Sequence, residues 1–242
     1  MNLRPEAPLG RLLRLPLRLV PKNAVVPILS GPNRGLRWRV GAGIHGCWLG
    51  SYERAKLRQF VDALAPHSVV YDIGAHAGYY TLAAARRARL VLAFEPNPAN
   101  QAALRFHLAR NRLDNVVVQD AAVGRAPGTA QFSEAGDAYQ GRLGGGALTV
   151  KVVALDALIA AGATAPDLVK MDVEGSELDA LDGAAALLAG RSTCWFIALH
   201  GPECARGAIA RLLEAGYRVR SLEGEALTQP RGDVEEIVAV PS

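Results

Sequence analysis

The segment VVYDIGAHAGYYTLAAA, from Val69 to Ala85, places an acid and two glycines at the end of an apolar run. Asp72, Gly74 and Gly78 follow a stretch with the composition of a buried strand, and a helix-like stretch follows them. In open parallel sheets, ligands bind at the carboxyl ends of strands, where the strand order reverses. Glycines without a β-carbon let the backbone turn tightly and let a bulky ligand touch main-chain atoms. These residues therefore predict a ligand site at this strand end.

Two further strand ends carry acids, and the three acids together indicate which ligand is bound. Glu95 in AFEPNP is placed to accept hydrogen bonds from two ribose hydroxyls. Asp120 in VVVQDAAVG is placed to accept one from an adenine amine. A nicotinamide site is the main rival, but GAHAG lacks its G-x-G-x-x-G fingerprint, and Asp72 would repel a pyrophosphate. The same carboxylate suits an ammonium and a sulfonium, so the pattern predicts S-adenosylmethionine, with S-adenosylhomocysteine as its product.

Methyl transfer requires in-line positioning of the acceptor atom, and an acceptor that carries a proton also requires a base that takes this proton. His200 ends TCWFIALH, and an unperturbed imidazole pKa near 6.5 suits a base at neutral pH. Asp172 and Glu174 in KMDVEGSE stand two apart, so both face one side if the strand continues. We expect His200 to be the base, with Asp172 as the second candidate and Glu174 beside it. Glu177 is expected to be a structural first-turn acid of the next helix.

A magnesium ion is an alternative way to acidify the acceptor group. Asp172 and Glu174 supply the oxygen ligands that Mg²⁺ prefers. No third carboxylate stands at a spacing that supports a site, so magnesium is not favoured and no metal ligand is assigned.

The elements that must position these residues alternate between strands and helices. Strands that are apolar throughout, separated by amphipathic helices, predict a parallel sheet covered on both faces, which is a doubly wound α/β fold. The expected strands of this sheet are residues 68–74, 89–97, 115–123, 167–174, 193–200, 217–224 and 234–241, and the expected helices are 79–88, 98–113, 176–190 and 202–216. A β-rich excursion over 129–156 contains a glycine cluster, 141–146, that is expected to be a loop.

The chain before this sheet differs in charge and pattern. Residues 1–58 contain eleven Lys/Arg and two Glu, whereas the remainder contains 16 Lys/Arg and 21 Asp/Glu. Residues 1–30 are expected to be a basic arm, with peripheral contact to a membrane surface as an alternative to a solvated tail. In residues 31–66, GLRWRV and CWLG are expected to be short strands and SYERAKLRQFVDAL a helix. The third expected unit, residues 67–242, holds the ligand site.

No apolar run reaches the roughly 20 residues of a spanning helix, and no cleavage site follows a signal-like core. The three cysteines lack metal-site or framework spacing. These features predict a soluble, cytoplasmic protein.

Several of these motifs resemble the FkbM family of S-adenosylmethionine-dependent methyltransferases. The similarity is carried by GPNRGLRWRVGAGIHGCWLGSYE, VVYDIGAHAGYYTL, AFEPNP, AAVG, VALD, DLVKMDVEGSELDALDGA and ALHG. It implies a class I Rossmann-like methyltransferase fold: a mostly parallel seven-stranded sheet, helices on both faces, and a small N-terminal β/helix extension. It also implies methylation of a hydroxyl on a small molecule, sugar or glycan.

The resemblance extends the expected cofactor site. Tyr52 and Glu53 in GSYE would close over the cofactor, and Ala121 would flank the adenine beside Asp120. The same motifs add Ala75, Tyr80, Pro96, Asn97 and Asp172 to the cofactor-binding residues. There are two departures: His76 stands where typical members have Asn, and Ala198 where they have an acid.

Other functions remain as alternatives. The basic N-terminal segment could suit a nucleic-acid methyltransferase, but DVEG replaces the N/D-P-P-Y/F strand end usual in base-modifying enzymes. Because Ala198 removes one acid near the acceptor, a weak or inactive nucleoside-binding protein of the same fold is the other alternative.

Overall fold

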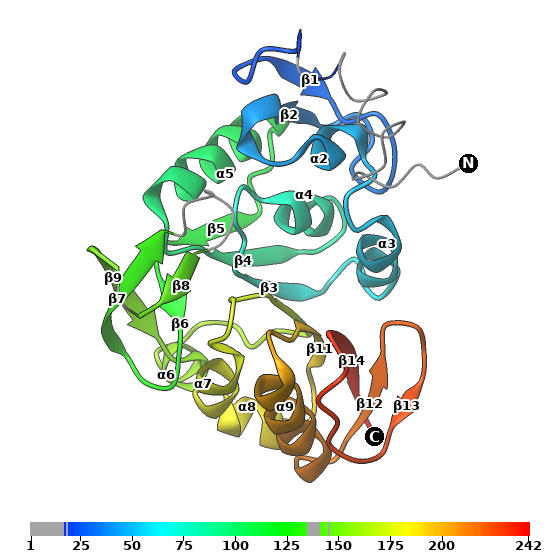
Figure 1. Ribbon diagram of the computed structural model, residues 1–242, viewed down its shortest axis with the longest axis vertical. Helices are drawn as coiled ribbons and strands as arrows, with labels where there is room; N and C mark the ends of the chain where they lie inside the picture. Colours follow the sequence, from blue (N-terminus) through cyan, green and yellow to red (C-terminus); the bar gives the residue numbers. More distant parts are fainter. Residues whose placement is uncertain (1–16, 18, 135–140, 145) are drawn as a thin grey trace.

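An eight-stranded central sheet runs through the molecule, with helices on both faces (Figure 1). The computed structural model describes residues 17, 19–134, 141–144 and 146–242. The strand order is β13-β12-β14-β11-β10-β3-β4-β5. The strands are β3 (Val69–Ile73), β4 (Leu90–Phe94), β5 (Val116–Gln119), β10 (Leu168–Met171), β11 (Cys194–Ala198), β12 (Tyr217–Ser221), β13 (Ala226–Leu227) and β14 (Glu236–Pro241).

Five neighbouring strands, from β11 to β5, are parallel, and β14, β12 and β13 join by antiparallel pairing. The predicted parallel-rich, doubly wound sheet is confirmed, with β13 as a short eighth strand. The chain goes from β3 outward to β4 and β5 and then returns to β10 on the other side of β3. The order therefore reverses between β3 and β10, which is where sheets of this kind bind ligands.

Alternate residues of each strand enter different cores, as expected for a sheet covered on both faces. In β3, Val70 packs into the core under the first group of helices, whereas Tyr71 and Ile73 pack into the core under the second group. The first group is α3 (Arg54–Asp62), α4 (Tyr79–Ala85) and α5 (Pro98–Asn111). The second is α6 (Leu155–Ala160), α7 (Glu177–Asp182), α8 (Ala185–Gly190) and α9 (Pro202–Glu214).

The helix predicted over 176–190 is divided into α7 and α8. The break lies at Gly183, where an added β-carbon would stand 2.1 Å from the carbonyl oxygen of Gly124. Close approach of these two backbones therefore requires glycine at this position.

The β-rich excursion forms a separate four-stranded sheet in the order β6-β9-β7-β8. Its strands are β6 (Ala122–Val123), β7 (Gly128–Glu134), β8 (Gly141–Leu143) and β9 (Leu148–Val153). The expectation of a loop over 141–146 is wrong for β8, which pairs antiparallel with β7. Gly144 and Gly146 lie outside the strands, whereas Gly145 and most of the basic arm are not among the described residues.

The N-terminal extension contains a two-stranded sheet, β1 (Val25–Pro27) and β2 (Arg37–Arg39), a short 3-10 turn η2 (Val40–Ala42), and helix α2 (His45–Leu49). The prediction that CWLG is a strand is wrong. Cys47 and Trp48 are adjacent and both buried, which a helical turn against the core allows and a half-exposed strand does not. Gly50 then ends α2 in the left-handed conformation.

A position in a helix rich in Arg and Ala predicts a solvated side chain for His107, but the structure does not place His107 on a solvated face of α5. It is fully buried and stacks on Trp38, with 4.0 Å between ring centroids. Its Nε2 accepts from the backbone N–H of Arg39 at 3.0 Å, and its Nδ1 lies 2.8 Å from the carbonyl of Ala77. The imidazole thus connects β2, α5 and the loop after β3.

Within the described residues, the helices are all too short or too polar to cross a membrane.

Candidate active site

A cavity of about 1180 Å³, counted with the part open to solvent, lies over the carboxyl ends of β3, β4 and β10. This is the point where the strand order reverses. The structure brings eight of the predicted cofactor-binding residues into the lining, together with Glu174 from the predicted catalytic group. The eight are Tyr52, Gly74, Ala75, Tyr80, Glu95, Pro96, Ala121 and Asp172.

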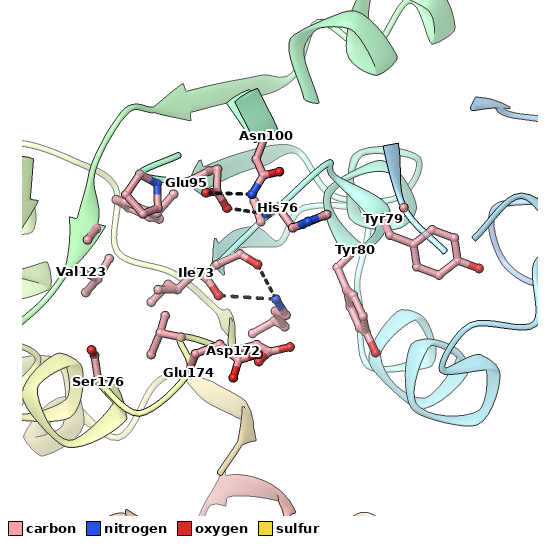
Figure 2. Close-up of a pocket in the computed structure, with 18 of the residues that line it drawn as sticks. Ile73, His76, Tyr79, Tyr80, Glu95, Asn100, Val123, Asp172, Glu174 and Ser176 are labelled. Carbon is pink, nitrogen blue, oxygen red and sulfur yellow. Dashed lines mark hydrogen bonds between the residues drawn. The ribbon is translucent and has the colours of Figure 1, made fainter. Parts of the chain in front are cut away.

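Glu95 is 4 % exposed and is held at the end of β4 by backbone donors. Its Oε2 accepts from His76 N at 2.7 Å, and its Oε1 accepts from Asn100 Nδ2 at 3.4 Å (Figure 2). Oε1 also accepts from Asn97 N at 2.9 Å. Burial raises the pKa of Glu95, and these hydrogen bonds act in the opposite direction. A carboxylate has about four acceptor sites, so capacity remains for a hydroxyl from the cavity.

Asp72 lies behind the cavity lining and is fully buried. Its Oδ2 accepts from Thr81 Oγ1 at 2.5 Å, and its Oδ1 lies 3.3 Å from the ammonium of Lys170. Lys170 is the cross-strand partner of Asp72 and itself lines the cavity. The structure thus places a lysine between Asp72 and the ligand space.

Lys170 stays charged although it is 4 % exposed. Burial opposes its charge, but Asp72 and Asp172 outweigh this effect, so the pKa of Lys170 is raised. The ammonium donates to the carbonyl of Gly74 at 2.8 Å. Lys170 therefore connects the buried carboxylate of Asp72 to the loop after β3 that contains Gly74 and Gly78, here called the glycine loop.

The glycine loop packs too closely for side chains. Gly74 has φ +75°, and a β-carbon there would lie 1.9 Å from the carbonyl oxygen of Asp172. Gly78 has φ +94°, and a β-carbon would lie 2.4 Å from Leu104 Cδ1. Gly74 thus lets the loop lie directly against the segment that carries Asp172, and Gly78 lets it lie against α5.

The remaining predicted cofactor residues are more dispersed. Asp120 is exposed and pairs with Arg105 at 2.6 Å, outside the cavity lining. Asn97 caps α5 by accepting from Ala99 N at 2.8 Å. Glu53 accepts from Tyr80 Oη at 2.7 Å and lines a neighbouring cavity.

This second cavity measures about 1100 Å³, again counted with its open part, and shares Tyr52, Asp172 and Glu174 with the first. Its lining includes His200, which follows β11, and Lys56 of α3. Six carboxylates line it: Glu53, Asp172, Glu174, Asp233, Glu235 and Glu236.

Asp172 and Glu174 lie together where the two cavities meet (Figure 2). Glu174 has φ 52°, so the strand conformation assumed in the sequence analysis does not continue to it. The two carboxylates nevertheless converge on His200: Nε2 lies 3.6 Å from Asp172 Oδ1 and 3.4 Å from Glu174 Oε2. Burial alone would raise the pKa of Asp172, but Lys170 and Lys56 lower it.

The other ring nitrogen of His200 faces a buried carboxylate. Its Nδ1 lies 2.6 Å from Oε1 of Glu177, which is fully buried at the start of α7. The hydrogen bond with Glu177 is the largest cause that raises the pKa of His200, and burial works against it.

Asp172, Glu174 and His200 also have ligand atoms within 4.8 Å of one another, close enough for a metal ion. His200 comes from a different strand, so residue spacing alone did not reveal this third group. The trio is compatible with either a base or an ion at this point.

Ala198 stands where typical family members have an acid, and it lines the second cavity. A carboxylate from another strand lies next to it. Its cross-strand neighbour is Glu236 of β14, which also lines that cavity. Glu236 pairs with Lys56 at 2.5 Å.

The sequence analysis missed several residues that line the first cavity. Lys170 and Asn100 are polar, and Trp38 and Tyr79 come from the N-terminal extension and α4. The indole N–H of Trp38 and the hydroxyl of Tyr79 are buried and have no hydrogen-bond partner among the described residues. A lysine inside the otherwise apolar run LVKM was the one available signal, because a buried charge requires a partner.

Comparison with known proteins yields one family and a set of related folds. Residues 72–219 match the Methyltransferase FkbM domain model. A methyltransferase FkbM from Methylobacillus flagellatus KT superposes with a TM-score of 0.51 at 19 % identity, covering 73 % of this chain and 44 % of that one. A precorrin-6y C5,15-methyltransferase from Geobacter metallireducens GS-15 superposes with a TM-score of 0.51 at 18 % identity, covering 78 % of this chain and 88 % of that one. The search of curated proteins found no match. At these identities the structures establish the fold.

Proposed function

The chain belongs to the FkbM methyltransferase family, and from this premise we propose that it transfers a methyl group from S-adenosylmethionine to a hydroxyl of a small-molecule, sugar or glycan acceptor. The observation that carries the proposal is the junction of the two cavities. One cavity has the residues of a nucleoside site, the other has a polar lining, and they meet at Asp172 and Glu174 beside His200.

The first cavity fits the donor by the chemistry of its lining. Glu95 offers carboxylate acceptor capacity for ribose hydroxyls, and the glycine loop presents bare backbone to the ligand. The unpartnered indole N–H of Trp38 and hydroxyl of Tyr79 are buried donors that a polar ligand group can satisfy. When bound, S-adenosylmethionine supplies a methyl group on a positively charged sulfur, and the acids at the junction suit that charge.

The second cavity suits an acceptor rich in hydroxyls, because carboxylates accept hydrogen bonds from hydroxyl groups. Six acids line it, with Lys56 already paired to Glu53 and Glu236. A sugar-like acceptor can satisfy several of these oxygens at once. A hydrophobic acceptor would leave them without partners, at a free-energy cost.

His200 is the proposed base. Its Nε2 faces the junction, where it can accept a hydrogen bond from an acceptor hydroxyl bound beside the carboxylates of Asp172 and Glu174. Deprotonated His200 takes the hydroxyl proton as the oxygen attacks the methyl carbon. Base assistance of this kind contributes on the order of 10²- to 10⁴-fold to the rate.

The proposal is tested by incubating the purified chain with trideuteromethyl-labelled S-adenosylmethionine and cell extract. We expect a deuterated methyl ether in the extract by mass spectrometry, and its absence with His200→Ala at unchanged S-adenosylhomocysteine affinity. Label that goes to nitrogen, carbon or nucleic acid would contradict the hydroxyl acceptor. No labelled product in any extract, despite tight cofactor binding, would favour a nucleoside-binding role.

A chelation arm in the same assay separates base catalysis from magnesium assistance. We expect the reaction to persist in EDTA and to be unaffected by added MgCl₂. Loss of transfer in EDTA with recovery on adding Mg²⁺ would assign the trio of Asp172, Glu174 and His200 to a metal ion instead.

A further inference from the structure

Glu177 is a buried acid that the proposed reaction does not yet use. It is fully buried in the first turn of α7, where an acid can simply complement the helix dipole. Its carboxylate is instead occupied by specific donors. Oε1 accepts from His200 Nδ1 at 2.6 Å and from Gly175 N at 3.1 Å, and Oε2 accepts from Cys204 Sγ at 3.1 Å.

The distances on the two sides of the imidazole are unequal. Nδ1 makes a short hydrogen bond with Glu177, whereas Nε2 lies 3.4 Å or more from its neighbours at the cavity junction. An ionised carboxylate only accepts hydrogen bonds. Glu177 therefore requires the proton on Nδ1, which leaves Nε2 as the nitrogen that gains and loses a proton.

Ionisation of Glu177 is supported by its surroundings. Burial alone would raise its pKa, but the hydrogen bonds from His200 and Cys204 lower it. A charged, buried carboxylate with fixed donors can hold the imidazole ring in one orientation.

We propose that Glu177 is the positioning residue of the active site, fixing the tautomer and orientation of His200 so that Nε2 faces the acceptor hydroxyl. This inference rests on the proposed function. As the acceptor oxygen bonds to the methyl carbon and the carbon–sulfur bond breaks, the hydroxyl proton passes to Nε2. The Nδ1 proton stays on the ring, and Glu177 stabilises the imidazolium that forms. The Nε2 proton then leaves to solvent through the open second cavity.

Several other groups face His200, and they share its electrostatic environment. Asp172 and Glu174 lie on the loop after β10, and Cys204 lies on α9. Across the second cavity are Glu53 and Lys56 from the α3 region, and Asp233, Glu235 and Glu236 around the start of β14. A test must therefore separate Glu177 from the general negative charge of this region.

The first test needs no acceptor. Histidine ring nitrogens of the ¹⁵N-labelled full chain are followed by NMR against pH, and the His200 signals are assigned by their loss in His200→Asn. We expect Nδ1 to remain protonated while Nε2 titrates with a pKa above the ordinary histidine value. A neutral His200 with its proton on Nε2 would overturn the inference, whatever the variants do.

The second test compares Glu177→Gln with Asp179→Asn, a matched acid-to-amide change on the exposed side of α7. We expect the His200 titration to move to lower pH in Glu177→Gln and to stay in place in Asp179→Asn. Equal shifts in the two variants would show a general charge effect and contradict the specific role.

The third test measures the rate of methyl transfer with labelled S-adenosylmethionine and cell extract. In Glu177→Gln, we expect the acid limb of the pH–rate profile to move to lower pH and the plateau rate to fall about 10²-fold, at unchanged S-adenosylhomocysteine affinity. A parallel loss of cofactor affinity would mean a merely structural role. If the NMR results hold but no transfer is found, the proposed function fails and the placement of Glu177 does not.

Discussion

Glu95 is the proposed acceptor for the ribose hydroxyls of the cofactor. Its two oxygens order the backbone of His76 and Asn97 and keep capacity for the ligand. We expect Glu95→Ala to lower S-adenosylhomocysteine affinity on the order of 10- to 10²-fold, because charge-assisted hydrogen bonds contribute about 1.5–3 kcal/mol. Titration calorimetry measures this. Asp62→Ala, which removes an exposed acid of α3, should bind like the parent. Parent-like binding by Glu95→Ala would remove the ribose assignment.

Lys170 supplies the positive charge that compensates the buried carboxylate of Asp72. We expect Lys170→Met to lower the free energy of unfolding by about 3–5 kcal/mol, because it leaves a buried charge without its partner. Adding Asp72→Asn should restore part of the loss. Chemical denaturation measures both.

The matched control for Lys170 is Arg58→Met, which removes one partner of an exposed pair with Asp62 at 3.3 Å. Exposed pairs contribute at most about 1 kcal/mol. If Lys170→Met were no more destabilising than Arg58→Met, the buried pair would not be important to stability.

At the scale of elements, the glycine loop after β3 is fixed by its contact with the segment after β10. Gly74 and Gly162 both have positive φ, but their surroundings differ. A β-carbon added at Gly74 would lie 1.9 Å from the carbonyl oxygen of Asp172, whereas a β-carbon added at Gly162 would have no atom within 4 Å. Gly162→Ala should cost about 1–3 kcal/mol for its backbone conformation alone. We expect Gly74→Ala to exceed it by a further 1–3 kcal/mol or so and to weaken S-adenosylhomocysteine binding. Equal thermal stabilities would contradict the close approach.

The order of the strands and helices of the main sheet was predictable, because buried parallel strands are continuous apolar runs and the helices between them are amphipathic. The conformation of the short elements could not be predicted from the sequence. CWLG contains only a few apolar residues, which a strand or a helical turn can bury, and β13 has two residues. Their conformation depends on what packs against them.

The pairing register between strands that are distant in the sequence also could not be predicted. Lys170 and Asp72 are register partners on strands almost a hundred positions apart, and Ala198 and Glu236 are another such pair. The acids and the histidine of the site were each identifiable from their strand ends. Which of them touch, and that Lys170 screens Asp72 from the cavity, follows only from the pairing register.

At the scale of the whole molecule, the N-terminal extension is attached to the main sheet partly through a neutral histidine. His107 accepts from Arg39 of β2, hydrogen-bonds to Ala77 of the loop after β3, and stacks on Trp38 of β2. Trp38 also lines the first cavity. The sequence suggested a solvated residue because α5 is rich in Arg and Ala, and the burial arises only because the extension covers that face.

Burial lowers the pKa of His107 to about 4, and the charge of Arg39 acts in the same direction. The folded protein therefore binds this proton less readily than the unfolded chain, whose histidine titrates near 6.5. The resulting stability is fully present above pH 6.5 and is lost as the pH falls from 6.5 to about 4. At 1.36 kcal/mol per pKa unit, the loss amounts to about 3 kcal/mol.

Urea denaturation between pH 7 and pH 4 tests this linkage by comparing His107→Gln with the parent. The variant is less stable at pH 7, because it loses the stack on Trp38, but its stability should fall by about 3 kcal/mol less over this range, since glutamine cannot be protonated. His67→Gln, which changes an exposed histidine, should keep the parent's full pH dependence. Equal slopes for His107→Gln and the parent would mean that His107 is protonated as readily in the folded protein as in the unfolded chain. The buried neutral imidazole would then not be what attaches the extension, and with it Trp38, to the first cavity.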